Sequence, residues 1–178
     1  MRRVSAAALK AGGEAIEPGI TTAEIDKIIH DFIVRHGARP NFLHLYGFPA
    51  TACISVNDTV IHGIPNKQQQ IRPGDIVSID TGCKIDGFNG DNACTYACGK
   101  IDLEAQRLLD VTKESLHRGI EMACGGNRVG DIGHAVQSYV EENGFSVVRT
   151  FVGHGVGKEL HEDPEVPNFG KSPDAVRV

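Results

Sequence analysis

The segment 75–97, DIVSIDTGCKIDGFNGDNACTYA, constrains the fold of this chain more than any other segment. Its Asp86-Gly87 dipeptide favours the two-residue turn of a β-hairpin, and residues of high β-propensity flank it on both sides. That turn sets a register in which Ile85 pairs with Phe88, Gly82 with Asp91 and Asp80 with Ala93. The sequence therefore predicts a hairpin whose two strands are fixed relative to each other.

Asp80 and Asp91 are diagonal neighbours in this register and share one face of the hairpin, because side chains alternate along a strand. We expect their Cα atoms roughly 7–8 Å apart, from where two carboxylates converge on one or two cations. Acids aimed together repel each other, so they shift pKa or recruit a cation. Two alternatives stay open: both acids face solvent, or a one-residue slip places them on opposite faces.

The chain also contains a weak internal repeat. We expect helices over 2–17, 21–37, 102–124 and 129–143, and strands over 52–56, 59–63, 75–80, 87–97 and 146–152. A shift of 107 residues superposes Leu9 on Leu116, Gly12 on Gly119, Glu14 on Glu121, Gly19 on Gly126, Ile25 on Ile132 and Gly37 on Gly144. The pattern predicts two related α–α–β units about a pseudo-two-fold axis, and the alternative is that any two helical hairpins look alike.

Composition excludes several other classes of protein. The 178 residues are 40% hydrophobic and 23% charged, which is typical of one globular domain over 1–178. A net charge of -5 without a basic cluster argues against nucleic acid, and no apolar run reaches the ~20 residues of a membrane span. Five cysteines without a CxxC pair indicate reduced thiols and a cytoplasmic location.

Three histidines lie in settings where site residues concentrate. His154 stands in a glycine-rich segment and is the softer ligand that a carboxylate pair often accompanies, although in isolation it would be a hydrogen-bonded loop histidine. His62 and His161 lie beside Gly or Pro at strand or loop ends. A histidine there can donate to an oxyanion or move a proton.

Three segments, NDTVIHGIP, SIDTGCKIDGFNGDNACTY and GHGVGKELHEDPEVPN, closely resemble the type I methionine aminopeptidases of bacteria. The resemblance covers nearly the whole chain. It implies the α/β (α+β) pita-bread fold, whose internal duplication agrees with the repeat. The implied activity is removal of the initiator methionine from new polypeptides whose next residue is small.

The resemblance also implies roles for individual residues. Asp80, Asp91 and His154 would bind two divalent metal ions, with Asp91 bridging them, and Co, Mn, Fe and Zn all suit such ligands. His62 and His161 would contact the substrate and act in catalysis. The wall of the methionine side-chain pocket would include Phe42, Phe48 and Cys53, while Leu45 replaces a tyrosine often found there.

Nascent polypeptide N-termini are the implied partners, which allows action at the ribosome by a cytoplasmic monomer. Members of the family run on past position 178, and the resemblance places two glutamate ligands in that segment. We therefore expect a second half without its last strands, an incomplete metal site, and little activity of this polypeptide alone. The alternatives are a non-catalytic pita-bread module that binds peptides or partners, and a proline-specific aminopeptidase relative.

Overall fold

The computed structural model describes residues 2–170 and divides into two compact units. The first unit takes in the chain as far as Asp102 together with Val156–Leu160, and the second takes in Leu103–Gly155 and the chain from His161 onward. The division falls where the predicted repeat places it. Whether the units form one catalytic domain, as the sequence predicts, stays a prediction.

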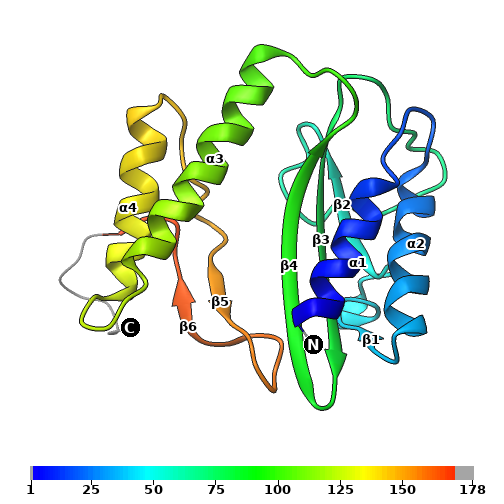
Figure 1. Cartoon of the computed structure of the whole chain (residues 1–178), viewed down its shortest axis with the longest axis horizontal. Coiled ribbons are helices and arrows are strands. Elements are labelled where there is room, and N and C mark those ends of the chain that lie inside the picture. Colours follow the sequence, from blue (N-terminus) through cyan, green and yellow to red (C-terminus); the bar gives the residue numbers. More distant parts are fainter. Residues whose placement is uncertain (1, 171–178) are drawn as a thin grey trace. The chain divides into compact units, whose positions relative to one another are not determined.

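The first unit is a helix pair on an antiparallel sheet (Figure 1). Its elements are α1 (Arg2–Glu14), α2 (Thr22–Arg35), β1 (Arg39–Pro40), the 3-10 turn η1 (Leu45–Gly47), β2 (Ala52–Val56), β3 (Ile76–Ile85) and β4 (Phe88–Ala97). Strand β3 lies in the middle, because β1 and β2 pair with one of its edges and β4 with the other. The register of β3 and β4 is the predicted one: Ile85 pairs with Phe88, Gly82 with Asp91 and Asp80 with Ala93.

The hydrophobic core of this unit lies between the sheet and the two helices. Val77 and Ile79 of β3 are fully buried on the face that α1 and α2 cover, and Ile25, Ile29 and Ile33 meet them from α2. Alternation along β3 sends the even-numbered residues to the opposite face. The helices thus cover one face of the hairpin. Asp80 and Asp91 lie on the opposite face, which the helices do not cover.

The second unit also begins with a helix pair. Its elements are α3 (Leu103–Met122), α4 (Val129–Glu142) and the short antiparallel strands β5 (Gly153–Gly155) and β6 (Glu162–Val166). Helices α3 and α4 pack side by side, as α1 and α2 do (Figure 1). Each unit therefore has the order helix, helix, strands, as the repeat predicts.

The two helix pairs make the same contact at equivalent positions. A Cβ atom built on Gly12 of α1 would lie 2.6 Å from Cδ1 of Ile29 on α2. A Cβ atom on Gly119 of α3 would lie 2.9 Å from Cγ2 of Val136 on α4. Both pairs are related by the shift of 107 residues. In both units a glycine lets the two helices approach closely at the same point.

The second helix of each pair also starts and ends alike. A capping box is present at Thr21, whose N–H donates to Glu24, and the N–H of Arg128 donates in the same way to Asp131. Beyond the helix ends, Gly37 and Gly144 have φ values of 72° and 77°, and their N–H groups donate to Val34 and Glu141. These are the left-handed C-terminal turns that glycine allows. Because α2 and α4 share the same type of N-terminal cap and the same C-terminal glycine turn, an internal duplication explains the two helix pairs better than two unrelated helical hairpins.

Two predicted strands are wrong. Residues 59–63 form no strand: Thr59 closes a turn onto Val56, His62 takes a left-handed φ of 57°, and Gly63 bonds to β2. Residues 146–152 are irregular, and the strand begins at Gly153 instead. In both segments β-branched residues suggested a strand, but neither segment forms a ladder with a neighbouring strand among the described residues. Strands β1 and β6 were not predicted.

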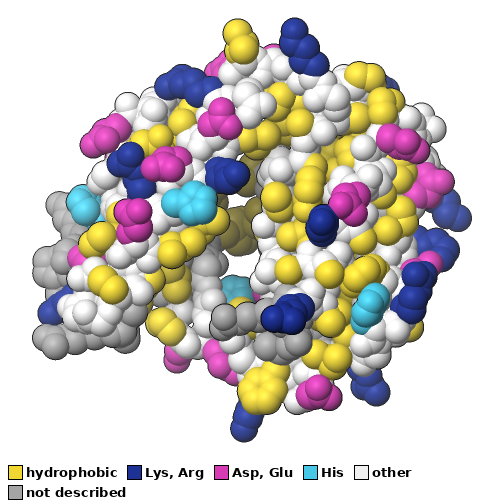
Figure 2. Space-filling view, viewed as in Figure 1, with side chains coloured by type: hydrophobic (Ala, Val, Ile, Leu, Met, Phe, Trp, Pro, Cys, Tyr) yellow, Lys and Arg dark blue, Asp and Glu magenta, His cyan; other side chains and the backbone are white. Residues whose placement is uncertain are grey.

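Among the described residues, no helix is long and apolar enough to cross a membrane. Lysine, arginine, aspartate and glutamate side chains lie dispersed over the face shown in Figure 2.

Candidate functional site

The centre of the candidate site is the pair Asp80 and Asp91 on the hairpin. Asp80 pairs with Ala93, and Gly82 pairs with Asp91, so the two acids are diagonal neighbours on the face away from the helices. Asp91 lies close enough to Asp80 to influence its pKa, and Oδ1 of Asp91 is buried. The predicted register, which places Asp80 and Asp91 side by side on one face, is confirmed. The alternative that both acids face solvent separately does not describe this pair.

Burial and repulsion from Asp91 shift the titration of Asp80. The pKa of Asp80 is raised to about 7, first because burial disfavours its charged form and second because Asp91 lies beside it. One proton shared by two carboxyl groups relieves the repulsion, and a cation would do the same. The carboxylate pair therefore fits a divalent metal ion by the chemistry of its donors.

Two predicted pocket residues lie on this same face. Cys53 of β2 is buried and pairs directly with Asp80, and burial with the nearby carboxylates raises the pKa of its thiol to about 12. Cys53 therefore stays an uncharged thiol and is no candidate nucleophile. The ring of Phe42 is buried and passes over Gly82, where its Cε1 atom would lie 3.3 Å from an added Cβ atom. Phe48 is half-buried in the loop that contains η1.

His62 is exposed and follows β2 in the same unit. Its neighbour Gly63 is bound to β2 by two hydrogen bonds, from the N–H of Ile54 to its carbonyl (2.9 Å) and from its N–H to Oγ of Ser55 (3.0 Å). A side chain at position 63 would collide with the Ile54 carbonyl, because a Cβ atom would lie 2.2 Å from it. The glycine after His62 thus fixes the loop against the strand that carries Cys53.

The second unit brings His154 and His161 together. Their ring centroids are 4.4 Å apart, edge to face. Nδ1 of His154 lies 2.9 Å from the carbonyl oxygen of Gly155, and donation there leaves Nε2 as the nitrogen with a lone pair. Metal-binding histidines are commonly oriented in this way. The glycines beside His154 are needed because β6 is close, and a Cβ atom on Gly155 would lie 2.5 Å from the Asp163 carbonyl.

The segment Val156–Leu160, between the two histidines in sequence, belongs to the first unit. Asn89 of β4 is buried and bonds it through its N–H to Gly157 (2.7 Å) and through Nδ2 to the carbonyls of Gly157 (3.0 Å) and Lys158 (2.8 Å). Lys84 of β3 adds a bond from Nζ to the Lys158 carbonyl (3.0 Å). Asn89 escaped the sequence analysis, although the predicted register places it on the Asp91 face.

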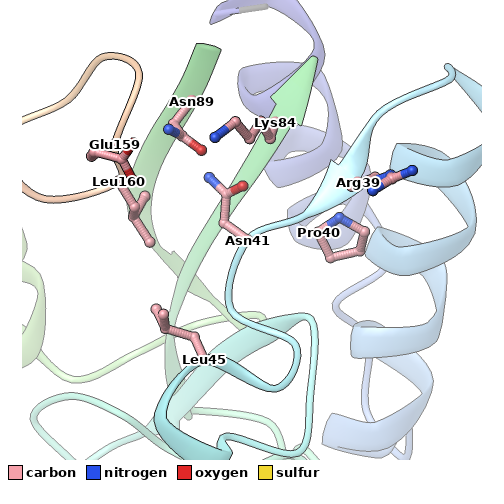
Figure 3. Close-up of a pocket in the computed structure, with 8 residues that line it drawn as sticks. All are labelled: Arg39, Pro40, Asn41, Leu45, Lys84, Asn89, Glu159 and Leu160. Carbon is pink, nitrogen blue, oxygen red and sulfur yellow. The ribbon is translucent and has the colours of Figure 1, made fainter. Parts of the chain in front are cut away.

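A pocket of about 270 Å³ lies in the first unit where this segment meets the hairpin (Figure 3). Its lining residues are Arg39, Pro40, Asn41, Leu45, Lys84, Asn89, Glu159 and Leu160. Asn41 was not predicted either. Its Nδ2 atom is buried without a hydrogen-bond partner among the described residues, which costs about 1–3 kcal/mol. Nothing in the sequence near Asn41 indicates this, because its surroundings come from β3 and β4.

The structure thus groups the predicted site residues by unit. Asp80, Asp91, Cys53 and Phe42 share a face in the first unit, and His154 contacts His161 in the second. Within residues 2–170, no group of three or more His, Cys, Asp or Glu side chains is arranged around a metal position. The common point predicted for Asp80, Asp91 and His154 draws on both units and stays a prediction.

Comparison with known proteins identifies the family. The model of metallopeptidase family M24 matches residues 1–177. Methionine aminopeptidase of Clostridium perfringens is 56% identical over 158 residues, which are 89% of this chain and 63% of the relative. Methionine aminopeptidase A of Synechocystis sp. is 39% identical and aligns with 99% of this chain and 70% of its own length. The chain therefore spans less than two thirds of the Clostridium relative.

Solved structures agree. The methionine aminopeptidase of Rickettsia prowazekii superposes with a TM-score of 0.95 at 37% identity, over 98% of this chain and 70% of the other. Prolidase from Pyrococcus furiosus superposes with a TM-score of 0.80 at 21% identity, over 96% of this chain and 49% of the other, which shows a common fold alone. The fold is the predicted α/β pita-bread fold. The family match over nearly the whole chain and these relatives show that the chain belongs to metallopeptidase family M24, among its methionine aminopeptidases.

Proposed function

We propose that this chain contributes metal-binding aspartates and site histidines to the active site of a metalloaminopeptidase that removes the initiator methionine from nascent proteins. One observation carries the proposal: Asp80 and Asp91 converge on the open face of a hairpin in a chain of the methionine aminopeptidase family. The substrates are the N-termini of nascent polypeptides, and the proposed setting is cytoplasmic, at the ribosome, with the protein as a monomer.

In this proposal Asp80, Asp91 and Nε2 of His154 hold two divalent metal ions, drawn from Co, Mn, Fe or Zn. Metal ions held by these residues would supply an acidified water and would polarise the scissile carbonyl. The hydrogen bond between Nδ1 of His154 and Gly155 supports the role of Nε2. Mutual repulsion of the carboxylates supports the role of the acids, because a cation relieves it.

The remaining residues bind and orient the peptide. His62 and His161 donate to the oxygen of the scissile amide, where negative charge develops. His161 lies against His154, so its ring is held next to the proposed metal ligand. Phe42, Phe48 and Cys53 form part of the wall around the methionine side chain, and the protonated Cys53 thiol keeps this wall uncharged beside Asp80.

Metal binding is tested on the 178-residue chain by titration with Mn²⁺, followed by electron paramagnetic resonance. We expect weak binding that Asp91→Asn abolishes and that Asp75→Asn, which changes an acid before β3, leaves intact. Equal binding by the wild type and Asp91→Asn would remove the basis of the proposal.

Turnover is tested on a chimera of residues 1–178 with the segment of the Clostridium perfringens relative that lies beyond the aligned stretch, because the resemblance places two glutamate ligands there. With Mn²⁺ or Co²⁺ we expect release of methionine from Met-Ala-Ser at an enzymatic rate of ~1–10³ s⁻¹. Release should be lost in Asp91→Asn, and much slower from a peptide with a large second residue. A folded, Mn²⁺-binding chimera that releases no methionine would contradict the proposed activity.

A further inference from the structure

The pocket of Figure 3 lies next to the carboxylate pair along the hairpin. Lys84 and Asn89 face each other across β3 and β4, one step along the same face from the pair Gly82 and Asp91. Two residues along a strand span about 6.7 Å. Asn89, which lines the pocket, is therefore two residues from Asp91 along β4 and lies on the same face of the hairpin as Asp91.

Asn41 connects the pocket with the carboxylate face. Its N–H donates to the carbonyl of Gly82 (3.0 Å), and its Nδ2 atom lies 3.0 Å from where a Cβ atom of Gly82 would be. A side chain at Gly82 would meet the carbonyl oxygen of Gly90, the amide of Asn41 and the ring of Phe42. The amide of Asn41 consequently lies over the strand position directly opposite Asp91.

The pocket offers hydrogen-bond donors and apolar walls. Nδ2 of Asn89 already donates to two carbonyl groups of the segment Val156–Leu160. Nδ2 of Asn41, in contrast, is buried with no hydrogen-bond partner among the described residues. Buried polar groups in native proteins nearly always have a partner, so this donor indicates a ligand that accepts a hydrogen bond. Leu45 and Leu160 line the same space (Figure 3), so the complementary ligand has a carbonyl oxygen beside an apolar group.

We propose that Asn41 is a substrate-binding residue, whose Nδ2 donates to a main-chain carbonyl oxygen of the peptide bound beside Asp91. That the ligand is a peptide rests on the proposed function. The donor itself rests on the burial of Nδ2 and its position over Gly82. Asn41 then positions the peptide, while the metals and histidines act on it.

The experiment is a titration of the ¹⁵N-labelled, metal-free 178-residue chain with Met-Ala-Ser, followed by NMR of the side-chain amide groups. The Asn41 amide signal, assigned by its absence in Asn41→Ala, is expected to move downfield as the peptide binds. Asn41→Ala should weaken binding about tenfold, as for one lost hydrogen bond. Its melting temperature should not fall, because the donor that it removes has no partner in the free protein.

Asn57→Ala is the matched control. The side chain of Asn57 is fully engaged, with Nδ2 donating to Asp75 (2.8 Å) and Oδ1 accepting from the N–H of Ile76 (3.0 Å). This control should melt at a lower temperature and bind the peptide as the wild type does. A second series reduces one carbonyl of the peptide at a time to a methylene, and one of these analogues should bind wild type and Asn41→Ala equally.

Unchanged peptide affinity in Asn41→Ala would overturn the inference, as would a parallel fall in melting temperature or the absence of any peptide binding by the wild type. Mn²⁺ binding, measured on the same samples, separates the two proposals. Loss of metal binding with intact Asn41-dependent peptide binding contradicts only the proposed metal site. Intact metal binding with Asn41-independent peptide binding contradicts only the role of Asn41.

Discussion

The two units begin with equivalent helix pairs but bury them to different degrees. In the first unit Ile29 is 0% exposed and belongs to a cluster in which α1, α2 and the sheet enclose one another. In the second unit Val136, its equivalent, is half-buried, and Leu116 and Ile120 of α3 are each 58% exposed. The same helical hairpin thus has a full core where a four-stranded sheet covers it, and a partial one where the described strands are short.

This difference shows what the sheet contributes to the site. A long hairpin with one face buried by helices has a fixed register, because a slip would expose its core residues. Asp80 and Asp91 depend on that register for their convergence. The histidines of the second unit depend instead on local contacts, namely the Gly155 carbonyl, each other, and the glycines that admit β6.

The largest expected effect tests the difference in core burial. Ile29→Ala should lower the free energy of unfolding by about 3–5 kcal/mol, because it leaves a cavity under the sheet. Val136→Ala at the equivalent position should cost about 1 kcal/mol, because its half-buried side chain loses less contact. Urea unfolding followed by circular dichroism measures both. Equal losses would show that the second helix pair is as well enclosed as the first.

The carboxylate pair gives the next largest effect, through pH. Because the pKa of Asp80 is raised to about 7 in the folded protein, its stabilising contribution is full below its unfolded pKa of about 4 and is lost as pH rises through 7. The metal-free chain should lose about 2–3 kcal/mol between pH 5 and pH 8 from this group. The raised pKa of the half-buried Asp26 acts with the same sign.

Asp80→Asn removes the repulsion at high pH and should flatten this pH dependence of the unfolding free energy. The same change should abolish Mn²⁺ binding, so stability at pH 8 and metal affinity change in opposite directions. Thermal melts at pH 5 and pH 8, with and without Mn²⁺, measure the first, and the titration measures the second. A variant as pH-dependent as the wild type would mean that Asp80 is not the group that titrates.

Much of this comparison follows from the sequence alone. Asp86-Gly87 fixes the hairpin turn because both residues accept positive φ values, which are 53° and 82° in the structure. The turn in turn fixes the register of β3 and β4, so the proximity of Asp80 and Asp91 was predictable. The glycines and apolar residues that repeat at a spacing of 107 predicted the helix pairs. Local signals were sufficient here because each feature depends on residues a few positions apart.

Sequence patterns do not reveal a residue whose partners lie far along the chain. Asn41 lies over Gly82, and Asn89 bonds Gly157 and Lys158, so neither contact leaves a local pattern. The strand predicted over 59–63 failed for the related reason that β-branched residues form strands only beside a partner. Motif resemblance predicted the candidate catalytic residues, whereas these supporting residues required the structure.

Asn89 provides a smaller effect that tests how the first unit holds the segment Val156–Leu160. Asn89→Asp keeps the shape of the side chain but removes both N–H donors of Nδ2, and should cost about 1–3 kcal/mol at this buried site. Amide hydrogen exchange should become faster in this segment while β3 and β4 stay protected. Asn92→Asp, on the opposite face where Asn92 donates to Ser5, should leave the segment unchanged. Uniform loss of protection in both variants would mean that Asn89 supports the whole hairpin and not the segment.

The smallest effect concerns the glycines at which the helices of each pair meet. Alanine gains about 0.5–1 kcal/mol over glycine inside a helix, and overpacking opposes this gain. At Gly12 the added Cβ meets Ile29, whose side chain is enclosed and has no space to move, so Gly12→Ala should destabilise by about 1 kcal/mol. At Gly119 the contact is longer and Val136 is half-buried, so the side chain can shift and Gly119→Ala should be close to neutral.

Urea unfolding measures the stability of both variants. Adding Ile29→Val to Gly12→Ala should recover part of the loss, because it removes the methyl group that lies nearest the new Cβ. If Gly119→Ala cost as much as Gly12→Ala, the second pair would be packed as rigidly as the first, and the exposed residues of α3 would need another explanation.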